Sequence, residues 1–204
     1  HTASLTGSDT GADAFLQRLG IRRARSLPVF LESLKLAHQF GPLSSNRIAS
    51  ISCSGGEAAL AADTAQGTGL IFPPLNPRQA KDLSAALGPM VAMANPLDYN
   101  TYIWRDQAAM TQAWAAMADD EIAMTLLVSD YPRADLCDAS DWECVTQAAI
   151  EATRRTGRPY AVVASLAELL PEQTAKTLMD HGVGAIHGLD HGLEAFDVMS
   201  RPMA

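Results

Sequence analysis

From residue 47 onward, short apolar runs alternate with longer stretches in which apolar and polar residues recur at helical spacing. The clearest run is Ile122–Val128, which is apolar almost throughout and is typical of a strand buried on both faces. The expected strands are 48–53, 69–72, 90–94, 122–128, 160–165 and 183–186. Strands separated by helices predict a parallel sheet joined by right-handed crossovers. The pattern thus predicts an α/β fold of three αβα layers, with a parallel, flavodoxin-like sheet of five to six strands.

The expected helices are marked by capping residues at their starts and by glycine or proline beyond their ends. Ser26 precedes a helix with Pro28 in its first turn, and Asn76 precedes one with Pro77 at its first position. The expected helices are 9–19, 27–40, 57–66, 77–87, 106–117, 141–156, 171–180 and 193–199. The first two precede the strand–helix alternation. We therefore expect residues 1–43 to form an appendage and residues 44–204 to form the α/β domain.

Composition narrows the classes of function. The chain is 48% hydrophobic, which allows a sizeable core. Its net charge of -8 argues against nucleic acid as a partner. No apolar run reaches the roughly 20 residues that a membrane-spanning helix needs. Three cysteines without metal-ligand spacing indicate reduced thiols and no metal site. His187 and His191 are four residues apart but lack the supporting pattern of a zinc site. We expect a cytoplasmic protein.

A glycine turn after the first expected strand is the strongest local signal of chemistry. Ser54, Gly55 and Gly56 join this strand to an alanine-rich helix that begins near Glu57. In such a turn, backbone N–H groups and the helix dipole favour an anion, most often a phosphoryl group. A glycine pair is also common where the backbone turns tightly without binding any ligand. The turn is therefore either a phosphate-binding site or only a tight connection.

Further polar residues follow other strands, at the edge where ligands bind in open parallel sheets. They lie in the stretches 52–57, 95–98 and 129–133, with Ser165 and His187 as further candidates. Asp98, in the sequence Asn95-Pro96-Leu97-Asp98, is either a turn residue or part of the site. Arg133 follows the central strand and either faces a phosphate or is a solvated loop residue.

Three segments together resemble one family. HTASLTGSD at the start, SGGEAALAAD after the first core strand and NPLDY downstream are similar to SHTGSLAGS, NAGGPGVLAAD and GNPVD of the NDP-forming acyl-CoA synthetases. These enzymes are the ADP-forming acetate–CoA ligases and their succinyl-CoA synthetase relatives. The segments occur in the same order and at similar spacing. The resemblance covers most of this chain but only a middle portion of the family's architecture.

The resemblance implies a role for each matching position. His1 matches the histidine that ATP phosphorylates and that passes its phosphoryl group to a carboxylic acid. Ser54, Gly55 and Gly56 match the turn that opens one of two helices facing the phosphohistidine. Asn95 and Asp98, with Arg133 as a loop candidate, are then expected near the site of acyl transfer.

Two departures from the family pattern bear on the site. Ala3 replaces a glycine, and Glu57-Ala58 replaces Pro-Gly after the paired glycines. Glu57 either competes with a bound phosphate in the helix's first turn or orients the imidazole.

The resemblance implies a portion of an acid–CoA ligase that forms acyl-CoA from a carboxylic acid, CoA and ATP through a phosphohistidine. No Gly-rich fingerprint for CoA or ATP is visible here, so ATP, magnesium and CoA are expected to act only in the full-length enzyme, and this portion alone is expected to be inactive. The expected partners are CoA-binding and ATP-grasp domains, a small carboxylic acid and, as a further possibility, a second copy. The alternatives are a non-catalytic acyl-CoA-sensing module on the same fold and a stand-alone flavodoxin-like binding domain.

Overall fold

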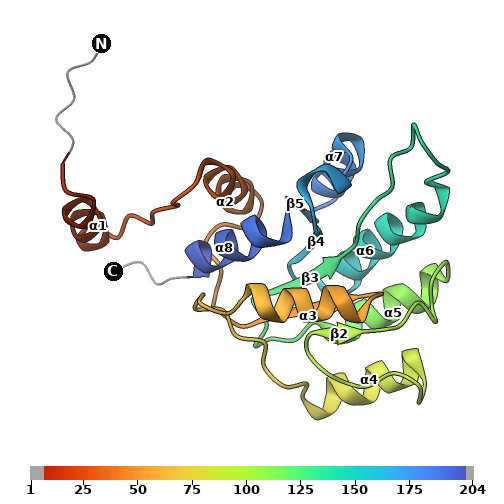
Figure 1. The fold of residues 1–204 in the computed structure, drawn as a ribbon. Helices are drawn as coiled ribbons and strands as arrows, with labels where there is room; N and C mark the ends of the chain where they lie inside the picture. Colours follow the sequence, from red (N-terminus) through yellow and green to blue (C-terminus); the bar gives the residue numbers. More distant parts are fainter. Residues whose placement is uncertain (1–6, 201–204) are drawn as a thin grey trace.

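The computed structural model describes residues 7–200 and contains one five-stranded sheet in which every strand is parallel (Figure 1). Its strand order is β2-β1-β3-β4-β5, the flavodoxin-like arrangement that the alternation of strands and helices predicts. The strands are β1 (Ile48–Ser52), β2 (Leu97–Asp98), β3 (Met124–Val128), β4 (Tyr160–Ala164) and β5 (Gly184–His187).

Helices cover both faces of the sheet. On one face pack α2 (Leu27–Phe40), α3 (Gly55–Thr64) and α8 (Leu189–Ser200), and on the other α4 (Pro77–Leu87), α5 (Gln107–Met117), α6 (Glu143–Thr156) and α7 (Glu172–Asp180). Alternate residues of β3 divide between the two cores: Met124, Leu126 and Val128 face the first, and Leu127 faces the second. The predicted three-layer αβα architecture is therefore confirmed.

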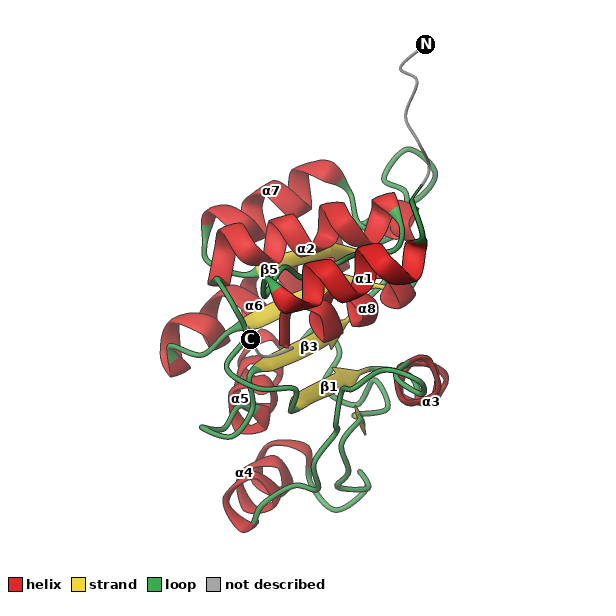
Figure 2. Ribbon diagram, turned by 90° about the vertical axis from the view of Figure 1, so that its left-hand side faces the viewer, coloured by secondary structure: helices red, strands yellow, loops and turns green. Residues whose placement is uncertain are grey.

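The helix α1 (Asp9–Arg18) lies away from the layers, on the side of α2 and α8 (Figures 1 and 2). None of its residues is buried. By contrast α2, which the sequence groups with α1, packs closely on α8 and on β5. Among residues 7–200, no helix is long and apolar enough to cross a membrane.

Two predicted strands are wrong. Within residues 69–72, only Ile71 pairs with another segment, through a single parallel bridge to Arg47. The pairing does not extend because Pro73 and Pro74 follow, and proline has no N–H donor. The stretch 90–94 is irregular, and the strand here is instead β2, where a turn was expected.

The side chain of Asn95 explains why no strand is needed at 90–94. Its Oδ1 accepts from the N–H of Ser50 at 3.0 Å, and its Nδ2 donates to the carbonyls of Ile48 at 3.1 Å and of Pro73 at 3.0 Å. One amide thereby occupies the hydrogen-bonding positions of β1 between the Ile71 bridge and β2.

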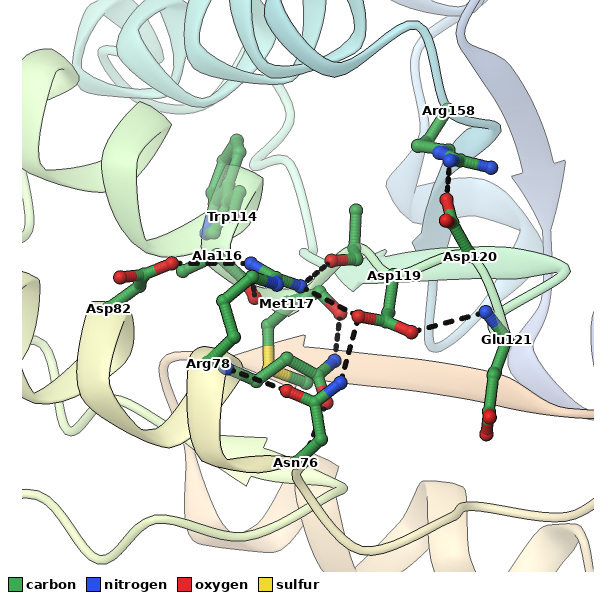
Figure 3. A network of polar contacts seen from close by, with 12 residues as sticks. Asn76, Arg78, Asp82, Trp114, Ala116, Met117, Asp119, Asp120, Glu121 and Arg158 are labelled. Atoms are coloured by element: carbon green, nitrogen blue, oxygen red, sulfur yellow. Dashed lines mark hydrogen bonds and ion pairs between the residues drawn. The ribbon is translucent and has the colours of Figure 1, made fainter.

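A polar network fixes α4 against the end of α5 (Figure 3). Asn76 and Gln79 form a capping box, and Nε2 of Gln79 donates to the carbonyl of Met117 at 2.6 Å. Asp119 accepts from Nδ2 of Asn76 at 2.8 Å and pairs with Arg78 at 3.1 Å.

The final helix begins at Leu189, four residues before its predicted start.

Candidate functional site

The turn between β1 and α3 lies at the carboxyl edge of the sheet and is open to solvent. Gly55 and Gly56 are exposed, and Ser54 is the N-cap with extended backbone but no side-chain capping bond. The hydroxyl of Ser52 donates to the carbonyl of Ser54 at 3.0 Å, which fixes the turn. This turn is not sealed beneath packing.

The first amides of α3 are available to a ligand. Ala58 is the first residue whose N–H bonds back into the helix, to the carbonyl of Ser54 at 3.0 Å. Within the described part of the chain, the N–H groups of Gly55, Gly56 and Glu57 have no acceptor. Three free amides at the positive end of a helix dipole suit an anion.

Asp98 lies directly against this turn. A Cβ atom added at Gly55 would lie 3.1 Å from Oδ2 of Asp98, so the glycine permits the close approach of the carboxylate. The other oxygen, Oδ1, accepts from the N–H of Asn100 at 2.8 Å. Asp98, the last residue of β2, therefore holds the segment that follows the strand and is a neighbour of the phosphate-binding candidates.

Glu57 is a carboxyl group with a strongly raised pKa at this edge. Burial, followed by the charges of Asp130 and Asp98, raises its pKa to about 7. Its Oε2 atom is buried and has no hydrogen-bond partner among residues 7–200. Near neutral pH the side chain is consequently divided between a proton donor and a carboxylate.

Asp130 is a member of the site that the sequence did not single out. It directly follows Ser129 at the end of β3, and its carboxylate accepts from the N–H of Ser165 at 2.6 Å and from the Ser165 hydroxyl. The sequence already placed the stretch 129–133, which contains Asp130, at this edge of the sheet. An aspartate two residues beyond the central strand had more reason to face the edge than an arginine further along the loop.

The structure does not bring Asn95 and Arg133 into this cluster. Both ends of the Asn95 amide are used by β1 and Pro73. The guanidinium of Arg133 is exposed and forms an ion pair with Asp135 at 2.6 Å. The donors of Asn95 are therefore taken up within the chain, and Arg133 is engaged with a carboxylate of its own loop.

His1 lies outside the described residues, and the structure shows only where α1, further along the chain, is placed. Nη1 of Arg22, just after α1, lies 3.9 Å from the sulfur of Met199 near the end of α8. Since α8 starts beyond the carboxyl end of β5 and runs back along the sheet, Met199 marks the amino edge. The α1 region and the start of α3 therefore lie at opposite edges (Figure 1).

His187 belongs to a separate cluster at the end of β5. Nζ of Lys35 donates to the carbonyl of Ala185 at 2.7 Å and lies 2.9 Å from Nδ1 of His187. Glu32, almost fully buried, pairs with Lys35 at 2.6 Å. Burial and the Lys35 charge lower the pKa of His187. This cluster ties α2 to β5.

Cys53 lies at the carboxyl edge of the sheet, directly after β1. Burial raises the pKa of the Cys53 thiol, so it is not a thiolate at neutral pH. Within the described range 7–200, no group of three or more His, Cys, Asp or Glu side chains is placed to hold a metal ion. A hollow of about 410 Å³ lies elsewhere, between α5 and α6, lined by residues that include Gln107, Gln147 and Arg155.

The sequence matches no protein-family model and no curated protein, whereas the fold matches solved structures. The crystal structure of PH0766 from Pyrococcus horikoshii OT3 aligns with a TM-score of 0.78 at 18% identity, over 96% of this chain and 44% of that one. A dinucleotide-forming acetyl-coenzyme A synthetase 1 from Ca. Korarchaeum cryptofilum aligns in its apo form with a TM-score of 0.75 at 15% identity. Its complex with phosphate and ADP aligns with a TM-score of 0.77 at 16% identity.

These alignments cover 97% and 98% of this chain but 42% of the synthetase chain. The chain thus spans less than half the length of the structures it is similar to. At such identities the likeness shows a shared fold.

Proposed function

We propose that this chain is the flavodoxin-type portion of an NDP-forming acid–CoA ligase, in which the first turn of α3 receives the phosphoryl group of a phosphohistidine. The observation that carries the proposal is the exposed glycine turn with three free amides, in a fold shared with an acetyl-CoA synthetase. In this proposal residues 1–43 carry the phosphohistidine segment and residues 44–204 the phosphate-facing domain. CoA-binding and ATP-grasp domains, ATP with magnesium, and the carboxylic acid belong to the complete enzyme.

The chemistry assigned to this chain is electrostatic. The amides of Gly55, Gly56 and Glu57 would donate to phosphoryl oxygens, which stabilises the transferring group without a proton donor that would favour hydrolysis. Deprotonated Glu57, with Asp98 and Asp130 nearby, would oppose a bound dianion. Protonated Glu57 would remove one of these charges and add a hydrogen-bond donor.

His1 enters the proposal through the assembled enzyme. Because α1 and the start of α3 lie at opposite edges of the sheet (Figure 1), we propose that the histidine meets α3 only in the assembled enzyme, together with its other domains. His1→Ala is expected to abolish acid-labile labelling of the assembled protein by γ-labelled ATP. His38→Ala, which changes an exposed histidine on α2, is expected to leave it intact. Labelling that survives in His1→Ala would remove this residue from the mechanism.

The anion site can be tested on the 204-residue chain itself. Sulfate, which stays dianionic, would be titrated into ¹⁵N-labelled protein at about pH 6 and about pH 8. We expect shifts of the Gly55–Glu57 amides, with affinity several-fold lower at the higher pH, and loss of this pH dependence in Glu57→Gln. The first-turn amides of α7, which also begins with a glutamate, are the control. Equal shifts at both helices would reduce the effect to non-specific binding and refute a dedicated site.

One observation favours the alternative of a non-catalytic acyl-CoA-binding module. Three carboxyl groups surround a position proposed for phosphate, and a module without phosphoryl transfer would tolerate them. Binding of acyl-CoA by the assembled protein without any phosphohistidine would support this alternative over the ligase.

A further inference from the structure

Three ionisable side chains meet where the last strand of the sheet ends. Glu32 and Lys35 lie on α2, and His187 is the last residue of β5. Nζ of Lys35 lies 2.9 Å from Nδ1 of His187 and 2.6 Å from Oε2 of Glu32. The other carboxylate oxygen of Glu32, Oε1, lies 3.9 Å from the same Nδ1. The ammonium group and the imidazole ring are therefore both close to one carboxylate.

The contact with Lys35 identifies the form of His187 in this structure. An ammonium group has only N–H donors, so Nδ1 accepts and the single ring proton of the imidazole is on Nε2. Burial and the Lys35 charge lower the pKa of His187 from its ordinary 6.5. The charge of Glu32 and a hydrogen bond with the main chain of Leu170 act in the opposite direction. The neutral ring is thus the form that fits beside Lys35.

The groups near the ring come from α2, from the loop after β4 and from the start of α8. The side chains of α2 are Lys35 and Glu32, and the loop contributes the main chain of Leu170. At the start of α8, Nε2 of His191 lies 3.7 Å from Oδ2 of Asp190, so these two side chains are directed at each other. The partners between which His187 can change are therefore Lys35 and Glu32.

A proton on Nδ1 would reverse the arrangement. The imidazolium would bring a second positive charge to within 2.9 Å of the ammonium group, where the two cations repel. Glu32 is only 7% exposed, and a buried carboxylate is costly without a cation beside it. The imidazolium supplies that cation, and Lys35, whose side chain is 27% exposed, can extend its ammonium group into water. The exchange keeps Glu32 paired.

Lys35 also connects α2 to the edge of the sheet. Its Nζ donates to the carbonyl of Ala185 at 2.7 Å. This carbonyl belongs to β5, the last strand in the order β2-β1-β3-β4-β5, which has no further strand beside it within the described residues. Elsewhere α2 is held in the core by Val29 and Leu36, which are buried. Loss of the Lys35 contact would therefore loosen α2 against β5 without detaching the helix.

We propose that Lys35, Glu32 and His187 form an acid-sensitive latch between α2 and β5. With neutral His187 the latch is closed, and Lys35 holds the strand. With protonated His187 it is open, because Glu32 pairs with the imidazolium and Lys35 leaves the carbonyl of Ala185. The latch does not depend on the proposed phosphoryl chemistry.

The direction of the pH dependence follows from linkage. The pKa of His187 is lowered in the folded chain, so below about pH 6.5 the unfolded chain binds more protons at this position than the folded chain does. The stability that the closed latch contributes is complete above this pH and is lost as the pH falls through the lowered pKa.

Amide hydrogen exchange of the 204-residue chain at about pH 7 and about pH 4.5 tests the latch, after correction for the pH dependence of exchange in unfolded peptides. We expect the protection of the α2 amides to fall several-fold at the lower pH, relative to α6 on the opposite face of the sheet. Asparagine in place of His187 sets an amide oxygen near the position of Nδ1 and takes up no proton. His187→Asn is therefore expected to keep the relative protection of α2 the same at both pH values.

His38→Asn is the matched control, because it changes an exposed histidine on the same helix. It should show the same loss of protection as the unchanged chain. An unchanged chain without this loss, or an equal loss in His187→Asn, would overturn the proposal.

The ring itself gives a second readout. In ¹⁵N NMR spectra at about pH 7, we expect the proton of His187 on Nε2 and none on Nδ1. Lys35→Met should raise the midpoint of the His187 titration and Glu32→Gln should lower it, because these side chains act on the ring with opposite sign. A proton on Nδ1 at neutral pH, or a midpoint that neither variant moves, would refute the latch.

Discussion

The carboxyl edge of the sheet and the outer side of α1 and α2 differ in how their side chains are engaged. At the edge, Asp98 accepts a hydrogen bond from the N–H of Asn100, and Asp130 accepts from Ser165. On the outer side of α1 and α2, which we call the apolar face, large side chains such as Phe15 and Phe30 remain about half exposed or more. The carboxylates of the first region are held by contacts within this chain, whereas the side chains of the second remain largely uncovered among residues 7–200.

This difference indicates where mutations should act. Side chains that complete the sheet should affect the free energy of unfolding of the isolated chain. Side chains of the apolar face should leave unfolding almost unchanged.

The largest expected effect contrasts the two sides of α2. Leu36 is 1% exposed and packs in the core, whereas Leu34 is 49% exposed. Leu36→Ala should lower the free energy of unfolding by about 2–5 kcal/mol, from lost burial and the cavity left behind. Leu34→Ala should change it by less than about 0.5 kcal/mol. Urea denaturation of both variants measures this, and equal losses would show that the outer side of α2 is already covered within the chain.

The next effect concerns Asn95. Asn95→Ala removes three hydrogen bonds and leaves main-chain groups of β1 without partners, so we expect a loss of about 2–3 kcal/mol. Gln66→Ala, which removes one exposed amide bond to Asp63, is the control and should cost less than about 0.5 kcal/mol. If Asn95→Ala were as mild as the control, Asn95 would be free for a role in binding.

The smallest effect concerns Glu57 and depends on pH. Its pKa is about 7 in the folded chain against an ordinary 4.5, so between these values the folded state keeps a proton that the unfolded chain releases. Stability should therefore fall as the pH rises through this range, and the full loss is reached above about 7. At about pH 8, Glu57→Gln should stabilise the chain by about 1–2 kcal/mol, a value reduced for screening because the side chain is only part-buried.

The measurement is the difference in unfolding free energy between Glu57→Gln and the unchanged chain at about pH 4.5 and about pH 8. Glu172→Gln, at the first position of α7 and exposed, is the control. A stabilisation that is the same at both pH values would contradict the assigned burial of a charge at Glu57.

Most of the strands and helices could be predicted from the local pattern of residues along the chain. Four of the five strands and the αβα layering agree with the sequence prediction, because apolar runs and capping residues act within a few positions of each other. The predicted strand 69–72 is reduced to one bridge by Pro73 and Pro74, which directly follow it. The predicted strand 90–94 failed for a non-local reason. At Ser50, a side-chain amide from a residue 45 positions away takes the place of a strand.

The candidate site was predictable in part. The turn at Ser54–Gly56 and the proximity of Asp98 agree with expectation, because strand ends meet at one edge in a parallel sheet. Asp130 and the raised pKa of Glu57 were not foreseen, since both depend on distances between separate loops. The placement of α1 at the far edge was not foreseen either.

By itself the sequence determined the strands β1, β3, β4 and β5 with the helices that follow them, the glycine turn and the charges available near it, because these depend on neighbouring residues along the chain. The tertiary structure alone decided which carboxyl groups meet around Glu57, that Asn95 serves β1 and that α1 remains uncovered. Each of these depends on how distant segments pack, and burial and electrostatic coupling arise only once those segments are in contact.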